Sequence, residues 1–259
     1  MGGALLRGWV AKKIGPIIAV DTAPSLELTA LAKKHHIAIF PAVANIDTVR
    51  ARACVVALKP QILKDELPSL RPVAQSGALM LSIAAGTSLA AMTKAWGRGA
   101  RILRAMPNTP GSIGRGITAL YAGKSATQKD KALAESLLAT LGATTWVKHE
   151  HDIDTVTAIS GSGPAYVFLM VEALADAAEA EGLPRAQAEQ LARATITGAG
   201  ALLDSNVTPP AELRRNVTSP KGTTEAALKI LMAKNGLSPL IRRAVAAARR
   251  RGAELGRLS

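Results

Sequence analysis

Acidic residues and aromatic rings are both scarce in this chain of 259 residues. Its 19 Asp and Glu stand against 32 Lys and Arg, and Phe, Trp and Tyr make up only 3% of the sequence. The formal net charge of +13 raises nucleic acid as a partner, but so few rings leave little material for stacking bases. The basic residues are also scattered, mostly over the expected polar faces and ends of helices. We therefore expect a general attraction for small anions and no specific binding of nucleic acid.

Cysteine and long apolar runs are scarce as well. Cys54 is the only cysteine, which excludes an internal disulfide, fits a reducing cytoplasm and, within the run CVVAL, predicts an inert packed thiol. The apolar stretch Ala165–Ala180 is interrupted by Glu172 and Asp176, so it predicts a buried helix and no membrane span. No basic start leads into an apolar run, as a secretory signal would require. We expect a cytoplasmic protein with no membrane partner.

Short aliphatic runs alternate with helical patterns in the first half of the chain. The runs that we predict as strands are Pro16–Val20, Ile37–Phe40, Cys54–Leu58, Leu79–Ile83, Arg101–Met106, Ile117–Tyr121 and Thr144–Val147. The helical patterns between them are Leu26–Lys34, Ile62–Leu70, Leu89–Trp96 and Gln128–Leu141. This alternation predicts parallel βαβ units and hence a doubly wound, Rossmann-like α/β domain over residues 1–147. Such sheets bind ligands at the carboxyl ends of their strands.

The strand signal ends near Lys148, and an all-α domain is expected over residues 148–259. Its predicted helices are His151–Ser160, Pro164–Glu181, Arg185–Ser205, Pro210–Val217, Thr223–Asn235 and Leu237–Leu255. Two stretches, Ala165–Ala180 and Ala186–Leu203, are apolar around most of the helix and need more cover than these helices readily provide. We therefore predict a homodimer through this domain, alone or within a larger assembly of dimers.

Two segments combine proline with glycine and hydroxyl residues ahead of a helical pattern: ISGSGPAY at Ile159–Tyr166 and NVTSPKGTT at Asn216–Thr224. Such a composition marks a helix start, whose unpaired N–H groups suit a carboxylate or phosphate. Either segment alone is more often a simple cap, but together they predict a pocket for a small anion. The serines of the first segment have no histidine beside them, which weighs against a hydrolase, and no metal site is expected.

Seven segments, in their order and spacing, resemble the delta-1-pyrroline-5-carboxylate reductase family over essentially the whole chain. They are ALKPQ at Ala57–Gln61, SIAAG at Ser82–Gly86, RAMPNTP at Arg104–Pro110, SGSGPAYVF at Ser160–Phe168, EALADA at Glu172–Ala177, GLPR at Gly182–Arg185 and ELRRNVTSPKGTT at Glu212–Thr224. The resemblance implies a dinucleotide-binding domain followed by a helical domain that interlocks with a second subunit. It also implies hydride transfer from NADPH or NADH to the C=N carbon of 1-pyrroline-5-carboxylate, which forms L-proline in the last step of proline biosynthesis.

The same resemblance implies the site residues. Thr224 is the expected catalytic residue, its hydroxyl holding the ring nitrogen. The expected substrate-binding residues are Asn216, Gly222, Thr223 and Thr224, with backbone amides at the helix start taking the carboxylate. The expected cofactor-binding residues are Met1, Gly2, Asp21, Thr22, Asn45, Ala57, Leu58, Lys59, Ala84 and Ala85. Asp21 favours the ribose hydroxyls of NAD, whereas Thr22 and Asn45 can accept NADP, so the choice of cofactor stays open.

The start of the chain departs from the family's pattern. The family opens with a strand and a turn resembling G-x-G-N-M-G, whereas Met1–Leu5 matches only the end of that turn and the helix after it. Because such a strand is central, its absence predicts two open neighbouring strand edges, weak cofactor binding and an unstable N-terminal half. We expect the true start to lie upstream; a genuine truncation is the alternative. A smaller departure is Lys221, which stands where the family usually has glycine.

Two other functions remain open from the sequence. One is a reductase of the same fold that acts on another small imine or keto acid, which a panel of substrates would distinguish. The other is a cofactor-deficient paralogue whose helical half only dimerises with a complete subunit. The paralogue predicts normal assembly with negligible NADPH binding.

Overall fold

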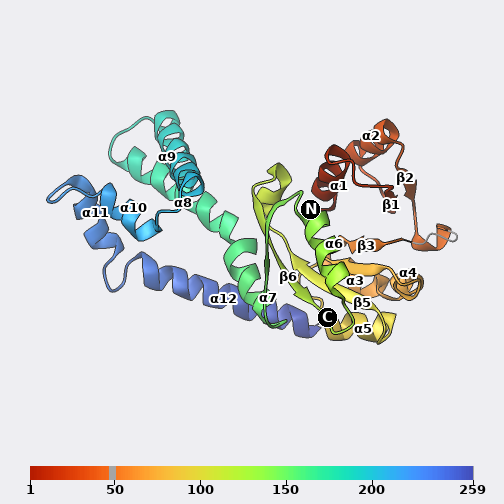
Figure 1. Cartoon of the computed structure of the whole chain (residues 1–259). Helices are drawn as coiled ribbons and strands as arrows, with labels where there is room; N and C mark the ends of the chain where they lie inside the picture. Colours follow the sequence, from red (N-terminus) through yellow and green to blue (C-terminus); the bar gives the residue numbers. More distant parts are fainter. Residues whose placement is uncertain (47–50, 259) are drawn as a thin grey trace. The chain divides into compact units, whose positions relative to one another are not determined.

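The computed structural model describes residues 1–46 and 51–258, and the chain divides into two compact units (Figure 1). Met1–Gly161 and Ala248–Ser259 form the first unit, and Ser162–Ala247 form the second. The sequence predicts the boundary at residues 147 and 148, whereas the structure divides after Gly161. The reason is that the short helix α7 (Asp152–Val156) packs against strands β5 and β6 and so joins the sheet unit.

The first unit consists of short strands and helices in alternation. Its strands are β1 (Ile18–Val20), β2 (Ala38–Phe40), β3 (Ala53–Val56), β4 (Leu79–Ser82), β5 (Arg101–Met106), β6 (Gly116–Ala122) and β7 (Gly142–Trp146). Its helices are α1 (Gly2–Ala11), α2 (Leu26–His35), α3 (Pro60–Glu66), α4 (Arg71–Gln75), α5 (Leu89–Trp96), α6 (Gln128–Leu138) and α7, with 3₁₀ turns at Val43–Asn45, Pro68–Leu70 and Thr109–Ile113. Every predicted strand is therefore present, most of them shorter than predicted.

Strand pairing corrects one part of the prediction. The strands β3, β4 and β5 are parallel neighbours, but β6 runs antiparallel to β5, with Leu103 opposite Ala122. Only the 3₁₀ turn at Thr109–Ile113 lies between β5 and β6, and a parallel crossover needs a dozen or more residues. The edge strand β7 is again parallel to β6.

The strands form two sheets rather than one. β1 and β2 pair with each other in a parallel ribbon, while β3 to β7 form a separate five-stranded sheet. Within the described residues, β1 and β3 therefore each have one strand neighbour, which is the pair of open edges that the sequence predicts. Ile18 and Val20 in β1 remain 38% and 41% exposed.

Apolar side chains cover both faces of the five-stranded sheet. One cluster lies beneath α1 and α6 and contains Leu5, Leu79, Leu81, Ile83, Leu103, Ala105, Leu120, Ala134, Leu137, Leu138 and Leu141. The other lies beneath α3, α4 and α5 and contains Val56, Leu63, Leu67, Leu70, Ala74, Met80, Ala84, Met92, Trp96 and Ile102. Leu79 and Leu81 face one cluster and Met80 faces the other, as the two-residue period of a strand buried on both faces requires.

The second unit is helical throughout. Its helices are α8 (Gly163–Ala180), α9 (Arg185–Ser205), α10 (Pro210–Asn216), α11 (Thr223–Leu231) and the first part of α12 (Leu237–Leu258). The hairpin of α8 and α9 is its main internal contact. At the tight connection, Arg185 bonds to the carboxylates of Asp176 and Glu189, which ties the two helices together.

The segment ISGSGPAY contains the predicted helix start, because α8 begins at Gly163 with Ser162 as its N-cap and Pro164 in its first turn. A π-helical turn at Thr157–Gly161 carries α7 directly into α8, and Ser162 already has helical backbone angles without a side-chain cap bond. The hydroxyl of Ser160 donates to the carbonyl oxygen of Val156 at 3.1 Å, back along the helix.

Candidate active site

The loops after β3 and β4 bring five of the predicted cofactor-binding residues together. Ala57, Leu58 and Lys59 follow β3, and Ala84 and Ala85 follow β4. The two strands pair in parallel, with Val56 opposite Ser82, so both loops leave the same edge of the sheet. Ala84 is buried, Ala85 is half-buried and Lys59 is exposed. Small side chains at this edge leave space for a flat ligand to approach the backbone.

The first turn of α1 lies against the loop after β3. A Cβ carbon placed on Gly2 would lie 3.0 Å from that of Ala57, so glycine permits the close approach. Leu5 donates its N–H to the carbonyl oxygen of Met1, and the amides before it begin the helix without intrahelical acceptors. The structure thus places Met1 and Gly2 beside Ala57, where the helix start can attract an anion.

The remaining predicted cofactor residues lie on the two-stranded sheet. Asp21 follows β1, where its N–H donates to Phe40 and its carboxylate accepts from the N–H of Ala23 at 2.9 Å. Thr22 is exposed beside it, and Asn45 ends the 3₁₀ turn after β2. These three residues are solvent-exposed and share one strand end, because β1 and β2 are parallel.

A partly buried ion pair that the sequence reasoning missed holds the loop after β4. The guanidinium of Arg104, in β5, donates to Oε1 of Glu150 at 2.8 Å, and the same oxygen accepts the N–H of Leu89 at 2.6 Å. Leu89 is the first residue of α5, so Glu150 caps the helix that follows the loop. The Arg104 side chain is only 7% exposed. No pattern signals this contact, because Glu150 is distant in sequence from both partners.

In the second unit, the predicted substrate residues lie on one turn between two helices. Asn216 ends α10 and is exposed, Gly222 is the N-cap of α11, and Thr223 and Thr224 form its first turn. The amides of this first turn have no acceptors within the helix. Thr224 is half-buried, whereas Thr223 is exposed. The second half of the predicted anion pocket is therefore a helix start.

Lys221 adopts a left-handed backbone conformation on this turn, with φ of 59°. A residue with a side chain is uncommon in this conformation, which glycine adopts without steric cost. Its N–H donates to the carboxylate of Glu225, which also pairs with the ammonium of Lys229 at 3.4 Å. Glu225 thereby fixes the turn from the helix side.

Two other features do not resemble a reactive site. Burial raises the pKa of the Cys54 thiol to about 11, so at neutral pH it is protonated and a poor nucleophile. Within residues 1–46 and 51–258, no group of three or more His, Cys, Asp and Glu side chains is placed to hold a metal ion.

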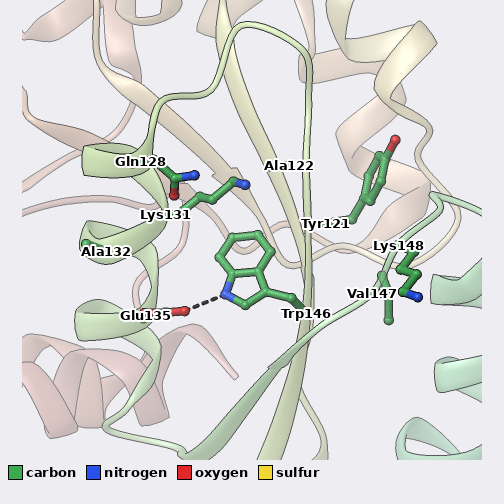
Figure 2. Close-up of a pocket in the computed structure, with 9 residues that line it drawn as sticks. All are labelled: Tyr121, Ala122, Gln128, Lys131, Ala132, Glu135, Trp146, Val147 and Lys148. Atoms are coloured by element: carbon green, nitrogen blue, oxygen red, sulfur yellow. Dashed lines mark hydrogen bonds between the residues drawn. The ribbon is translucent and has the colours of Figure 1, made fainter.

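An open cleft of about 510 Å³ lies between α6 and strands β6 and β7 (Figure 2). Its floor is the indole of Trp146, whose N–H donates to the carboxylate of Glu135. The ammonium of Lys131 lies 5.4 Å from the centre of the indole ring. Trp146, Glu135 and Lys131 thus interact with one another, and none of the predicted site residues lines the cleft.

Comparison with known proteins points in one direction. Residues 150–255 match the family model described as pyrroline-5-carboxylate reductase dimerisation. The pyrroline-5-carboxylate reductase of Pseudomonas aeruginosa is 42% identical over 214 residues, which span 83% of this chain and 76% of that protein. The solved structure of a pyrroline-5-carboxylate reductase from Coxiella burnetii superposes with a TM-score of 0.89 and 34% identity, covering 98% of this chain and 94% of that one.

A third protein with a related structure carries a nucleotide. It is the pyrroline carboxylate reductase of Plasmodium falciparum with NADP bound, with a TM-score of 0.80 and 28% identity over 99% of this chain and 96% of that one. The sheet unit, the helical unit and the segments around the candidate site all lie within these matches. The chain therefore belongs to the pyrroline-5-carboxylate reductase family.

Proposed function

We propose that this protein reduces 1-pyrroline-5-carboxylate to L-proline by hydride transfer from NAD(P)H, the last step of proline biosynthesis. The observation that carries the proposal is the Pseudomonas aeruginosa reductase, 42% identical over most of both chains. The loops at the carboxyl ends of β3 and β4 and the turn before α11 supply the local chemistry that such a reaction needs.

The residues of the first unit fit a dinucleotide. The start of α1 beside Ala57 offers amides and a partial positive charge to a pyrophosphate. Ala84 and Ala85 leave room for a flat ring, and Lys59 supplies a cation next to them. Asp21 suits the ribose hydroxyls of NAD, while Thr22 and Asn45 are compatible with the 2′-phosphate of NADP. We accordingly propose that these residues bind the cofactor, and NADH and NADPH are both tried in the test below.

The reaction asks little acid–base chemistry of the protein. The nicotinamide ring supplies the hydride. In our proposal the amides of Gly222, Thr223 and Thr224 hold the substrate carboxylate, and Asn216 adds a side-chain contact. The Thr224 hydroxyl would hold the ring nitrogen of the protonated imine, which already carries its proton and becomes the amine of proline when the C=N carbon accepts the hydride. Catalysis is then chiefly the orientation of one ring against the other.

We further propose a cytoplasmic homodimer that forms through the helical unit and can assemble further. Asp152–Ala180 is, within the described residues, one helical stretch long and apolar enough to cross a membrane by length and composition, and 11% of its most apolar window is buried. The same stretch lies in the part that matches the dimerisation family model. A second subunit is therefore the cover that we propose for it, rather than lipid.

The test is NAD(P)H oxidation, followed by absorbance, with 1-pyrroline-5-carboxylate as substrate. Thr224→Ala is expected to lower kcat far more than it weakens NAD(P)H binding, while Thr208→Ala, in the loop before α10, serves as the matched control. Asn216→Ala is expected to raise the substrate KM chiefly. Wild-type protein that folds and dimerises without oxidising NADPH or NADH would contradict the proposal. Activity retained by Thr224→Ala would remove Thr224 from the mechanism alone.

A further inference from the structure

Both chain connections to the helical unit reach the same loop of the sheet unit. One connection passes through Glu150 and α7, and the other is α12, which begins in the helical unit and ends among residues 248–258 of the sheet unit. The loop is Thr87 and its neighbours, residues 84–88, between β4 and α5. We call it the β4–α5 loop.

The end of α12 lies directly against this loop. Gly86 has a positive φ of 78°, and a Cβ carbon placed on it would lie 3.7 Å from Cβ of Leu255 and 3.9 Å from the amide nitrogen of Gly256. In the opposite direction, a Cβ carbon on Gly256 would lie 3.4 Å from the carbonyl oxygen of Gly86. The helix therefore passes close to the loop, with glycine on each side and space for about one carbon atom between them. Figure 1 shows this end of α12 next to α5 and α7.

The other connection holds the far end of the loop. Oε1 of Glu150 accepts the N–H of Leu89, directly after the loop, and also the guanidinium of Arg104. A charge-assisted bond of 2.6 Å to the first amide of α5 fixes where the loop ends and the helix begins. α7 and α12 also meet, since a Cβ carbon on Gly252 would lie 3.9 Å from that of Asp154. The β4–α5 loop is thus held from both sides by the two segments that lead to the helical unit.

We propose that Glu150 and the pair Leu255–Gly256 are positioning residues that set NAD(P)H affinity through the β4–α5 loop. The inference rests on the proposed function, because it takes Ala84 and Ala85 to line the cofactor. Because Glu150 bonds to the residue after the loop and the end of α12 lies beside Gly86, changes at either place are expected to alter where Ala84 and Ala85 lie.

The test measures the dissociation constant of NADPH by fluorescence titration of the full chain. Gly256→Val pushes on the carbonyl oxygen of Gly86, and Glu150→Gln keeps an acceptor for Leu89 but removes the charge. Leu255→Ala removes the part of that side chain beyond its Cβ, which is the atom nearest Gly86. Gly256→Val and Glu150→Gln are each expected to weaken NADPH binding by about tenfold, and Leu255→Ala, at a side chain that is 45% exposed, by less. Glu254→Ala, one position from Leu255 and exposed, is the matched control and is expected to bind NADPH normally.

Two readouts separate positioning from a merely structural role. The Leu255→Ala and Gly256→Val proteins are expected to keep the wild-type Tm and dimeric state. The double variant Leu255→Ala/Glu150→Gln is expected to lose less NADPH affinity than the sum of the single losses, because both changes release the same loop. Glu150→Gln leaves the buried Arg104 without a charged partner, which can prevent folding. In that case the NADPH affinity of Gly256→Val decides whether the proposal holds, since this variant leaves the Arg104–Glu150 pair intact.

Ala85→Leu distinguishes failure of this inference from failure of the proposed function. Weak NADPH binding by Ala85→Leu, with normal binding by Leu255→Ala and Gly256→Val, would overturn the positioning role alone. Normal binding by Ala85→Leu would place the cofactor elsewhere and overturn both. Equal loss in Glu254→Ala and Leu255→Ala would show a general effect of the helix end and would also overturn the positioning role.

Discussion

The two units bury their apolar side chains to very different degrees. In the sheet unit, the three consecutive residues Leu79, Met80 and Leu81 are all fully buried. Two apolar clusters cover both faces of the sheet. In residues 162–247, all of them described, the buried side chains are Ala175, Ala188 and Ala192. The large apolar residues there, such as Phe168 at 61% exposed, face outward. Similar hydrophobic content therefore makes a self-contained core in one unit and an interface in the other.

The sharpest way to break this contrast is a charge on the exposed apolar surface of α8. Phe168→Asp is expected to abolish the dimer, because a carboxylate in an apolar interface is desolvated without a partner. Light scattering after size-exclusion chromatography measures the mass. Glu179→Ala, a polar position on the same helix, is the control. A Phe168→Asp protein that stays dimeric would place the interface on another face of the unit.

A cavity in the sheet unit is expected to have the next largest effect. Leu81→Ala removes a fully buried side chain from the cluster beneath α1 and α6 and is expected to lower the free energy of unfolding by about 2–5 kcal/mol. Leu202→Ala makes the same chemical change at a side chain that is 51% exposed in the single chain. The loss of unfolding free energy caused by Leu202→Ala is expected to depend on protein concentration, whereas the loss caused by Leu81→Ala is expected not to. Urea unfolding at two concentrations measures both.

Ion pairs also differ between the two units, and their removal is expected to have smaller effects on stability. Asp130 in the sheet unit is 2% exposed, accepts from Arg101 at 2.7 Å and completes the capping box with Thr127 at the start of α6. Asp130→Ala is expected to cost about 1–3 kcal/mol, since it removes a cap and leaves a cation unpaired. Arg185, on the surface of the helical unit, makes more ion pairs, yet Arg185→Ala is expected to shift Tm less. Scanning calorimetry of both variants checks the order.

The labelling rate of the Cys54 thiol measures how often the sheet unit opens, independently of the helical unit. The thiol pKa of about 11, raised by burial, is expected to make labelling by a thiol reagent at pH 8 slow until the unit opens. Because the folded pKa lies above the unfolded value of 9.0, unfolding becomes easier as pH rises from about 9 to about 11, and Cys54→Ala is expected to lose this part of the pH dependence. Phe168→Asp is expected to leave the labelling rate unchanged. Faster labelling in that variant would show that the sheet unit depends on the dimer.

The sequence predicts the elements better than their pairing. Leu89–Trp96 and Arg185–Ser205 match the observed helices at both ends, because Ser88 and the turn around Gly182 give clear local signals. The sequence did not predict the antiparallel direction of β6, since strand periodicity carries no sign of direction. The open edges of β1 and β3 were predictable because they follow from strand order rather than from local propensity.

The candidate site divides in the same way. The loops after β3 and β4 could be placed from short motifs and the rule that ligands bind at strand ends. The helix start within ISGSGPAY was predicted, but the π-helical turn that joins it to α7 was not, because composition gives no signal for such a turn. Glu150, Leu255 and Gly256 gave no signal, since their contacts join residues far apart in the chain. The roles of Thr224 and Asn216 still await the substitutions described above.

The course of α12 has a consequence for biosynthesis. Residues 248–258 pack with the first unit but leave the ribosome after all of the helical unit. The sheet can therefore form early, yet the β4–α5 loop meets its last neighbour only at the end of translation. The helical unit is in effect a long insertion between two parts of one folding unit, and its exposed helices emerge while that unit is still incomplete. A nascent chain paused before residue 248 would be the form most prone to capture by chaperones.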